Sequence, residues 1–322
     1  MTMSDPSDED REKAFRYFFF PSDNWQLADG VDDPVLASPE EFRELGGAFV
    51  RNLDSVISTV SMPFLMATSA EFQRRFQQIH IAERIRARTD IESGEPPESA
   101  ARIALERAHA RMRAEKEAPD TANTYGTAIL RDLSALSDNE KFKNAALELL
   151  RQGVVLVWGA LEVLAEDLFI AFLNRNPKVV LSLMRDERTK RYFQLRDISL
   201  DVLAEHGFDL SDKLGGVILR QKGIDNVAVM RDVYDVLAPG NVAIQTALRE
   251  DDLWKLNQRR HLIVHRRGVV DAAYLAKTGE VLPIGSHLCV SPQELERYIE
   301  LVRGAGSSML SALAVAGSKG VN

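Results

Sequence analysis

Most hydrophobic positions along this chain recur with the period of an α-helix. Apolar residues three or four positions apart fall on one face of a helix, where they can pack against a core. Segments with this spacing lie at about 39–60, 69–90, 138–175, 178–194, 197–206 and 226–237. The pattern predicts an all-α protein.

Turn-forming residues divide the chain. Gly94, Pro96 and Pro97 interrupt the helical pattern, and a charged helix is expected from Pro97 to about Glu117. Residues 119–126 then have the composition of a linker. We therefore expect residues 1–120 to form a helical N-terminal region of unknown role and residues 128–316 to form a second domain.

The start of the chain mixes an acidic segment with an aromatic one. Residues 1–12 are acidic and polar and are expected to fray. Four consecutive aromatic residues follow at 17–20, and Pro21 closes them. This aromatic run is expected to dock against other helices.

The C-terminal part carries clear start and stop signals. A helix is expected from near 242 to Arg267, ended by Gly268 in the left-handed conformation that glycine tolerates. Two short extended segments flanking residues 277–280 would make a small β-hairpin, which is a further expectation. Ser291 and Glu294 have the spacing of a capping box, with Pro292 in the first turn, and predict a final helix over 292–314.

Composition limits the choice of function. With 45% hydrophobic residues in 322, the chain can bury a core. Its net charge of -8 gives no overall positive field, so contact with RNA would need a local cluster of cations. The longest apolar stretch, 154–170, is interrupted by acidic residues, and no leader is apparent, so we expect a cytoplasmic protein without membrane contact. The single cysteine, Cys289, excludes an internal disulfide and a cysteine-based zinc cluster.

One predicted helix departs from the plain amphipathic pattern. In residues 253–268 the apolar positions Leu253, Leu256, Ile263 and Val264 share a face, and Arg260 occupies the position between them. An arginine on an apolar face needs an anionic partner or ligand. His265 lies five residues beyond Arg260, about 140° around the helix.

The same helix concentrates cations in an otherwise acidic chain. Four arginines fall among residues 259–267, together with His261 and His265, which are spaced i,i+4. Guanidinium groups pair with the planar oxygens of a phosphate or a carboxylate. The patch is therefore a candidate site for an anion, and no set of residues with metal-ligand spacing accompanies it.

These residues resemble a known family. Arg260-His261-Leu262-Ile263-Val264-His265 fits the Arg-x4-6-His motif of HEPN domains, including the polar residue that often follows the arginine. Trp158-Gly-Ala-Leu-Glu162, followed by Asp167-Leu168, is similar to a helix with a Leu-Glu step that precedes the motif in several HEPN families. Residues 268–271, 274–275, 279 and 288–291 resemble the tail of a bacterial subgroup, of the RiboL-PSP-HEPN-like or abortive-infection type. The resemblance covers residues 128–316.

The resemblance implies a metal-independent endoribonuclease that needs no cofactor. It places the site in a cleft between the two protomers of a homodimer and suggests a role in bacterial toxin–antitoxin systems or antiviral defence, with an antitoxin or defence protein as a further partner. His265 would transfer the proton and Arg260 would stabilise the charge of the reacting phosphate. The other site residues expected are His261, Arg259, Arg266 and Arg267 for binding the RNA, with Glu162 and Asn257 in support.

The chain departs from the family in one respect. Some HEPN toxins are controlled by nucleotide transfer onto a tyrosine two places after the histidine, and Arg267 stands at that position here. Control of that kind is therefore not expected.

A different function fits the same residues. The chain could form a non-catalytic helical dimer whose cationic groove binds a nucleotide, an RNA or a partner protein, with Arg260 tied to a neighbour such as Glu162. Two other basic runs, at 74–88 and 185–196, are interleaved with acidic residues, so they are read as solvated helix faces rather than as tracks for an RNA backbone.

Overall fold

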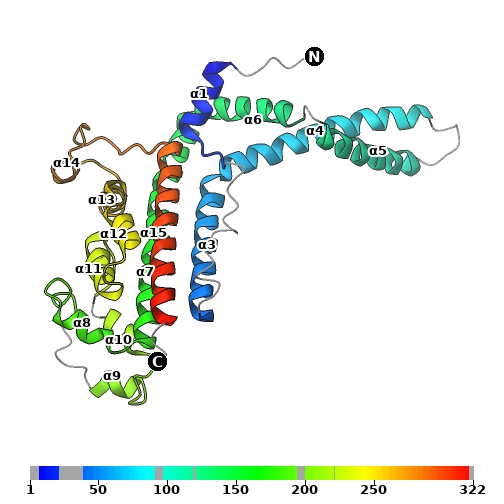
Figure 1. Ribbon diagram of the computed structural model, residues 1–322. Helices are drawn as coiled ribbons and strands as arrows, with labels where there is room; N and C mark the ends of the chain where they lie inside the picture. Colours follow the sequence, from blue (N-terminus) through cyan, green and yellow to red (C-terminus); the bar gives the residue numbers. More distant parts are fainter. Residues whose placement is uncertain are drawn as a thin grey trace. The chain divides into compact units, whose positions relative to one another are not determined.

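The structure is a computed structural model that describes residues 7–21, 39–90, 97–118, 121–193, 200–220 and 222–318. Its helices (Figure 1) are α1 (Asp8–Tyr17), α3 (Glu40–Val60), α4 (Met62–Asp90), α5 (Pro97–Glu117), α6 (Thr121–Ser137), α7 (Glu140–Arg175), α8 (Val179–Arg185), α9 (Leu200–Glu205), α10 (Leu214–Leu219), α11 (Val227–Leu237), α12 (Val242–Arg249), α13 (Asp251–Arg266), α14 (Ala272–Thr278) and α15 (Pro292–Ser318). The prediction of an all-α protein is confirmed.

The chain forms two compact units that do not coincide with the predicted division. The first unit comprises Met1–Phe20 and Val60–Glu148, and the second comprises Pro21–Thr59 and Leu149–Asn322. Helix α3 therefore groups with the C-terminal part, whereas α6 and the start of α7 group with the N-terminal part. The predicted boundary near 120 falls inside the first unit.

The first unit is built by the packing of α4 on α5 and of α1, α4 and α5 on α6. Ala87, Ala104 and Ala108 are fully buried, which lets α4 and α5 approach closely. Phe18 and Phe19 are 3% and 2% exposed, so the expected docking of the aromatic run is confirmed. The expected fraying of residues 1–12 is wrong for residues 8–12, which begin α1 behind a capping box of Ser7 and Asp10.

The predicted linker at 119–126 is wrong where the structure describes it, because α6 begins at Thr121. Tyr125, Ile129 and Leu133 follow one another at four-residue spacing and belong to the buried core of the first unit. Burial of this apolar face outweighs the turn preference of the residues that precede it. Residues 119 and 120 lie outside the described residues.

Three long helices supply much of the core of the second unit. Helix α3 buries Phe42, Phe49, Leu53 and Val56 along one face. A side chain at Gly306 of α15 would overlap the ring of Phe49 and the side chain of Leu164 on α7, so α3, α7 and α15 meet at this glycine. A fragment without residues 1–119 would lose α3 and expose this surface.

We expect Gly306→Ala to destabilise the protein by about 1–3 kcal/mol, because a methyl group there overpacks a core that includes Phe49 and Leu164. Gly304→Ala is the matched control, since nothing lies within 4 Å of a Cβ at that position. The control should be neutral or should stabilise the helix by up to about 1 kcal/mol. Thermal unfolding followed by circular dichroism measures both variants, and equal effects would contradict the packing of α3 on α15.

Helices α11, α12, α13 and α15 pack on one another and hold the predicted site helix. The single helix expected from near 242 to Arg267 is broken at Glu250, whose backbone is extended (φ -59°, ψ 127°). The final helix is confirmed: the Ser291 hydroxyl accepts a hydrogen bond from the Glu294 N–H at 3.1 Å, and α15 continues to Ser318.

The expected β-hairpin around 277–280 is wrong, because α14 occupies residues 272–278. Asp271 caps its N-terminus by accepting from the N–H of Tyr274 at 2.8 Å, and Gly279 ends it in the left-handed conformation (φ 69°). Residues 268–270 pair instead with residues 285–288, through one isolated antiparallel bridge between Val269 and His287.

One helix among the described residues, Pro292–Ala316, is long and apolar enough to cross a membrane by length and composition, with a mean hydropathy of 1.2. Its residues Tyr298, Ile299 and Val302 are at most 1% exposed. Burial of this kind is compatible with a core helix of a soluble protein. The cytoplasmic location stays a prediction.

Candidate functional site

Helix α13 presents one apolar face to the core and one polar face to solvent. Leu253, Leu256, Leu262 and Ile263 are at most 5% exposed. Val264 was expected on this face, but its side chain is 47% exposed, and Leu262 is buried in its place. The buried face holds the backbone of α13 in position, so the polar side chains project from a rigid support.

The helix ends one residue earlier than predicted. Arg267 is already left-handed (φ 53°), and its N–H and that of Gly268 both reach the carbonyl oxygen of Leu262. Gly268 follows with φ 73°. A left-handed arginine is an unusual conformation for a residue with a side chain, and it places Arg267 at the exposed end of the helix.

Arg260 pairs with Glu162 across α13 and α7. Its Nη2 lies 3.4 Å from the Glu162 Oε2, and the two side chains are 24% and 23% exposed. Burial raises the pKa of the Glu162 carboxyl, and neighbouring Glu166 and Asp225 add to this, while Arg260 opposes it. The net rise in the pKa of Glu162 means that its attraction to Arg260 does not fully offset the free energy needed to remove the carboxylate from water.

His261 and His265 lie side by side on the solvent face of α13. Both residues are exposed, and their ring centroids are 4.4 Å apart. Partial burial lowers the pKa of His261, and the positive groups of His265, Lys277 and Arg260 lower it further, against the opposing effect of Asp271. His261 is therefore neutral at pH 7 and can accept a hydrogen bond as well as donate one.

Arg259 is buried in an ion-pair cluster. Its side chain is 12% exposed and contacts the carboxylates of Glu280 at 3.0 Å and Glu294 at 2.5 Å. Burial lowers the pKa of the guanidinium, but Tyr298, Glu294 and Glu280 outweigh it and hold the pKa above its ordinary value. These surroundings disagree with the predicted role of Arg259 in binding RNA.

The remaining predicted residues divide between surface and core. Arg266 is exposed and lies 3.4 Å from Asp271, and Arg267 is exposed as well. Asn257 is 7% exposed, so it is placed to support the helix rather than to contact a large ligand. Of the predicted site residues, Arg260, His261 and His265 therefore lie on α13, and Glu162 of α7 contacts Arg260.

Sequence reasoning did not find the cluster around Arg259. Its carboxylates come from the segment after α14 and from the first turn of α15, and the hydroxyl of Tyr274 donates to Glu280 at 2.9 Å. No local pattern connects these three segments. The one available signal was the presence of two adjacent arginines, which lie about 100° apart around the helix and so need not be equally exposed.

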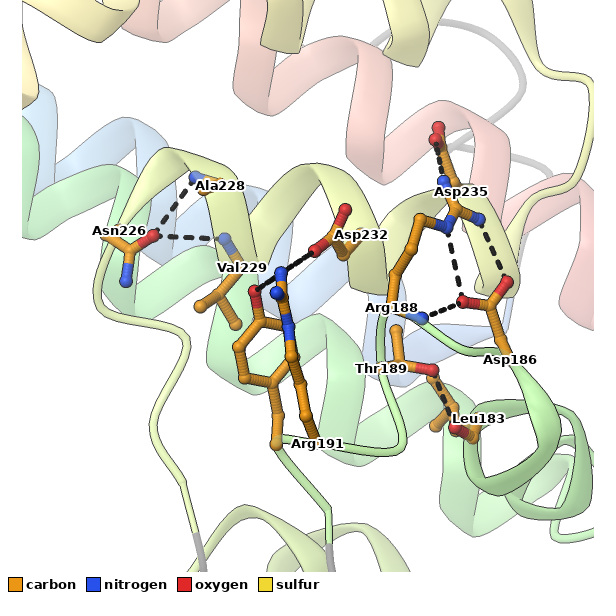
Figure 2. Close-up of polar contacts among 11 residues, drawn as sticks. Leu183, Asp186, Arg188, Thr189, Arg191, Asn226, Ala228, Val229, Asp232 and Asp235 are labelled. Carbon is orange, nitrogen blue, oxygen red and sulfur yellow. Dashed lines mark hydrogen bonds and ion pairs between the residues drawn. The ribbon is translucent and has the colours of Figure 1, made fainter.

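The other basic runs are largely paired with carboxylates. Arg188 donates to Asp186 and Asp235 at 3.0 and 2.8 Å, and Arg191 donates to Asp232 at 3.0 Å (Figure 2). These contacts attach the segment after α8 to α11. In the first unit, Arg74, Arg75 and Arg86 pair with Glu71, Glu115 and Glu83. Arg196 lies outside the described residues.

Fold and site together define an all-α protein with an Arg-x4-His motif on a well-packed helix, in which the histidine is exposed and the arginine is partly buried. Comparison of the chain with protein-family models, with curated proteins and with solved structures gave no match. The resemblance to HEPN domains therefore stands on the residues of the motif and its flanks.

Proposed function

We propose that the protein is a metal-independent endoribonuclease of the HEPN type that acts as a homodimer, in bacterial toxin–antitoxin systems or antiviral defence. The observation that carries this proposal is the exposure of His265 on the same rigid helix as Arg260. The resemblance to HEPN domains supplies the reaction and the biological setting.

The side chains suit transfer of a phosphoryl group within RNA. The 2′-hydroxyl would lose its proton to an imidazole, attack the adjacent phosphate and displace the 5′-oxygen, which takes up a proton. His265 performs the proton transfer, and Arg260 stabilises the charge that grows on the phosphorane oxygens. His261, being neutral, positions the phosphate or the sugar by hydrogen bonding.

Geometry favours a site made by two copies of the chain. In-line displacement places the attacking and leaving oxygens on opposite sides of phosphorus, and each needs an acid–base group within about 2.6–3.2 Å. His261 and His265 of one copy have ring centroids 4.4 Å apart, too close together to flank both oxygens. A second α13, related by twofold symmetry, brings an imidazole to the other side.

Cleavage of RNA tests the proposal. Purified protein is incubated with a panel of single-stranded and structured RNAs, with and without EDTA, and products are resolved on denaturing gels. Cleavage that persists in EDTA and disappears in His265→Ala supports the proposal. Absence of cleavage across the panel, or equal cleavage by His265→Ala, would contradict it.

The non-catalytic alternative is favoured by one contact, the Arg260–Glu162 ion pair. If Arg260 were retained for stability, the pair should contribute strongly to folding. We expect instead a coupling free energy of about 0–1 kcal/mol, because the two groups touch at one long contact and both reach solvent. A double-mutant cycle with Arg260→Ala and Glu162→Ala, read by urea unfolding, measures this coupling. A value of about 3 kcal/mol or more would favour the structural role.

A further inference from the structure

His261 and His265 form a pair of imidazoles on the solvent face of α13. The two residues are four positions apart on the helix, so both side chains lie over the same strip of its surface. Both residues are exposed, and their ring centroids lie 4.4 Å apart. Two histidines at this spacing on one helix face are an arrangement by which proteins bind Zn²⁺, because a nitrogen of each ring can reach the same point.

The distance between the two rings fits a shared metal ion. A transition metal lies about 2.0–2.1 Å from an imidazole nitrogen, and therefore about 3.2 Å from the centroid of that ring. Two centroids 4.4 Å apart then subtend an angle of about 90° at the ion. Tetragonal Cu²⁺ and Ni²⁺ prefer such an angle, and small rotations of these exposed side chains reach the wider tetrahedral angle of Zn²⁺.

The charges around the pair decide which ions it can take. Only a neutral imidazole has a nitrogen free for coordination, and partial burial, together with His265, Lys277 and Arg260, keeps the pKa of His261 low. Lys277 and Arg260 also repel a metal cation, whereas Asp271 attracts it. Binding therefore depends on the bonds to nitrogen, which favours transition metals over Mg²⁺, whose preferred ligands are oxygens.

Two side chains make an open site. Among the residues that the structure describes, no group of three or more histidine, cysteine, aspartate or glutamate side chains is placed to hold a metal ion. Catalytic zinc ions usually have three protein ligands, and structural zinc ions have four. An ion held by two imidazoles keeps water at its other positions and exchanges with the solvent, so its occupancy follows the concentration of free metal.

We infer that His261 and His265 together bind one divalent transition-metal ion, of the Zn²⁺, Cu²⁺ or Ni²⁺ type, and that the bound ion blocks the proton transfer assigned to His265. The blocking rests on the proposed function, whereas the binding does not. A neutral imidazole has one nitrogen lone pair, and coordination occupies the lone pair that would accept the proton of the 2′-hydroxyl. The ion is therefore a reversible inhibitor of cleavage.

Calorimetric titration of the full-length protein with ZnCl₂, without RNA, tests the binding. The wild type should bind one ion per chain, and His261→Ala and His265→Ala should each raise the dissociation constant about tenfold or more, because only one of two linked ligands remains. His287→Ala is the matched control, since it removes an exposed histidine of the same unit outside the pair, and it should bind Zn²⁺ like the wild type. All variants should keep the wild-type thermal transition because the replaced side chains are exposed.

Electron paramagnetic resonance of bound Cu²⁺ gives a second reading of the same site. The spectrum should show two nitrogen ligands in the wild type and in His287→Ala. It should show one nitrogen ligand in His261→Ala and in His265→Ala. Two nitrogen ligands in every variant would place the bound ion elsewhere and overturn the inference.

RNA cleavage tests the blocking. Saturating Zn²⁺ should lower the wild-type rate by a factor on the order of 10², as the loss of a general base does. EDTA should restore the rate, and Mg²⁺ at the same concentration should not lower it. At a Zn²⁺ concentration that saturates the wild type but not His261→Ala, the ratio of rates with and without Zn²⁺ should be close to one in the variant.

The outcomes separate this inference from the proposed function. It is overturned if the wild type binds no Zn²⁺, if both alanine variants bind Zn²⁺ like the wild type, or if binding leaves the cleavage rate unchanged. A wild type that cleaves no RNA contradicts the proposed function and overturns the inhibitory role with it. The titration then still decides whether the two histidines bind a metal ion.

Discussion

Replacing His265 with alanine is expected to lower the rate of RNA cleavage by a factor on the order of 10² to 10⁴, the usual loss when a general acid or base is removed. The neighbouring His261 is expected to replace it poorly, because the resemblance assigns the proton transfer to His265 and a hydrogen-bonding role to His261, whose ring lies beside it with centroids 4.4 Å apart. Folding should be nearly unchanged, since His265 is exposed. Single-turnover cleavage of a labelled RNA measures the effect.

Two further variants test whether the loss of RNA cleavage is specific to His265. Arg260→Ala should reduce turnover strongly and RNA binding modestly, because Arg266 and Arg267 remain exposed while the group matched to the transition state is lost. His261→Ala is the control, with a smaller loss of rate than His265→Ala. A larger loss of cleavage rate in His261→Ala than in His265→Ala would assign the proton transfer to His261 and the hydrogen-bonding role to His265.

Fold class and some of the helix ends were accessible to sequence reasoning because they depend on local signals. The hydrogen bond from the Glu294 N–H to the Ser291 hydroxyl caps the start of α15 as expected. Asn226 shows the same principle at α11, where its side chain accepts from the N–H groups of Ala228 and Val229. Such signals act within one turn of helix, so a linear reading can find them.

The division into units was not accessible in the same way. Helix α3 precedes α4 directly in the chain, yet its buried residues Phe49 and Leu53 belong to the second unit. The reason is a packing relation between Phe49, Gly306 and Leu164, which are far apart in sequence. Hydrophobic periodicity shows that a helix has an apolar face but not which helix covers it.

The candidate site was predicted only in part, because some of its contacts also join residues that are far apart in the sequence. The pairing of Arg260 with Glu162 was named as an alternative, because both residues interrupt apolar stretches and opposite charges in such positions tend to meet. The burial of Arg259 was not foreseen. On a helical wheel it lies only about 100° from Arg260, and the carboxylates that bury it come from segments with no sequence signature of their own.

Replacing Arg259 with methionine should cause the largest loss of stability among the variants considered, about 3–5 kcal/mol at neutral pH. Methionine keeps the apolar stem but removes the charge. The carboxylates of Glu280 and Glu294, whose side chains are 19% and 22% exposed, then lose their shared cation. Leaving partly buried charges without a partner is the main cost.

Arg266→Met is the matched control, since Arg266 is an arginine of the same helix whose side chain is 67% exposed beside Asp271. Its effect should stay within about 1 kcal/mol, as for other exposed ion pairs. Urea unfolding measures all three proteins. Because Arg259 donates a hydrogen bond to Glu280, Arg259→Met should also speed hydrogen exchange at residues 279–288 below the unfolding temperature. Equal stability of the two variants would show that the cluster around Arg259 does not support the fold.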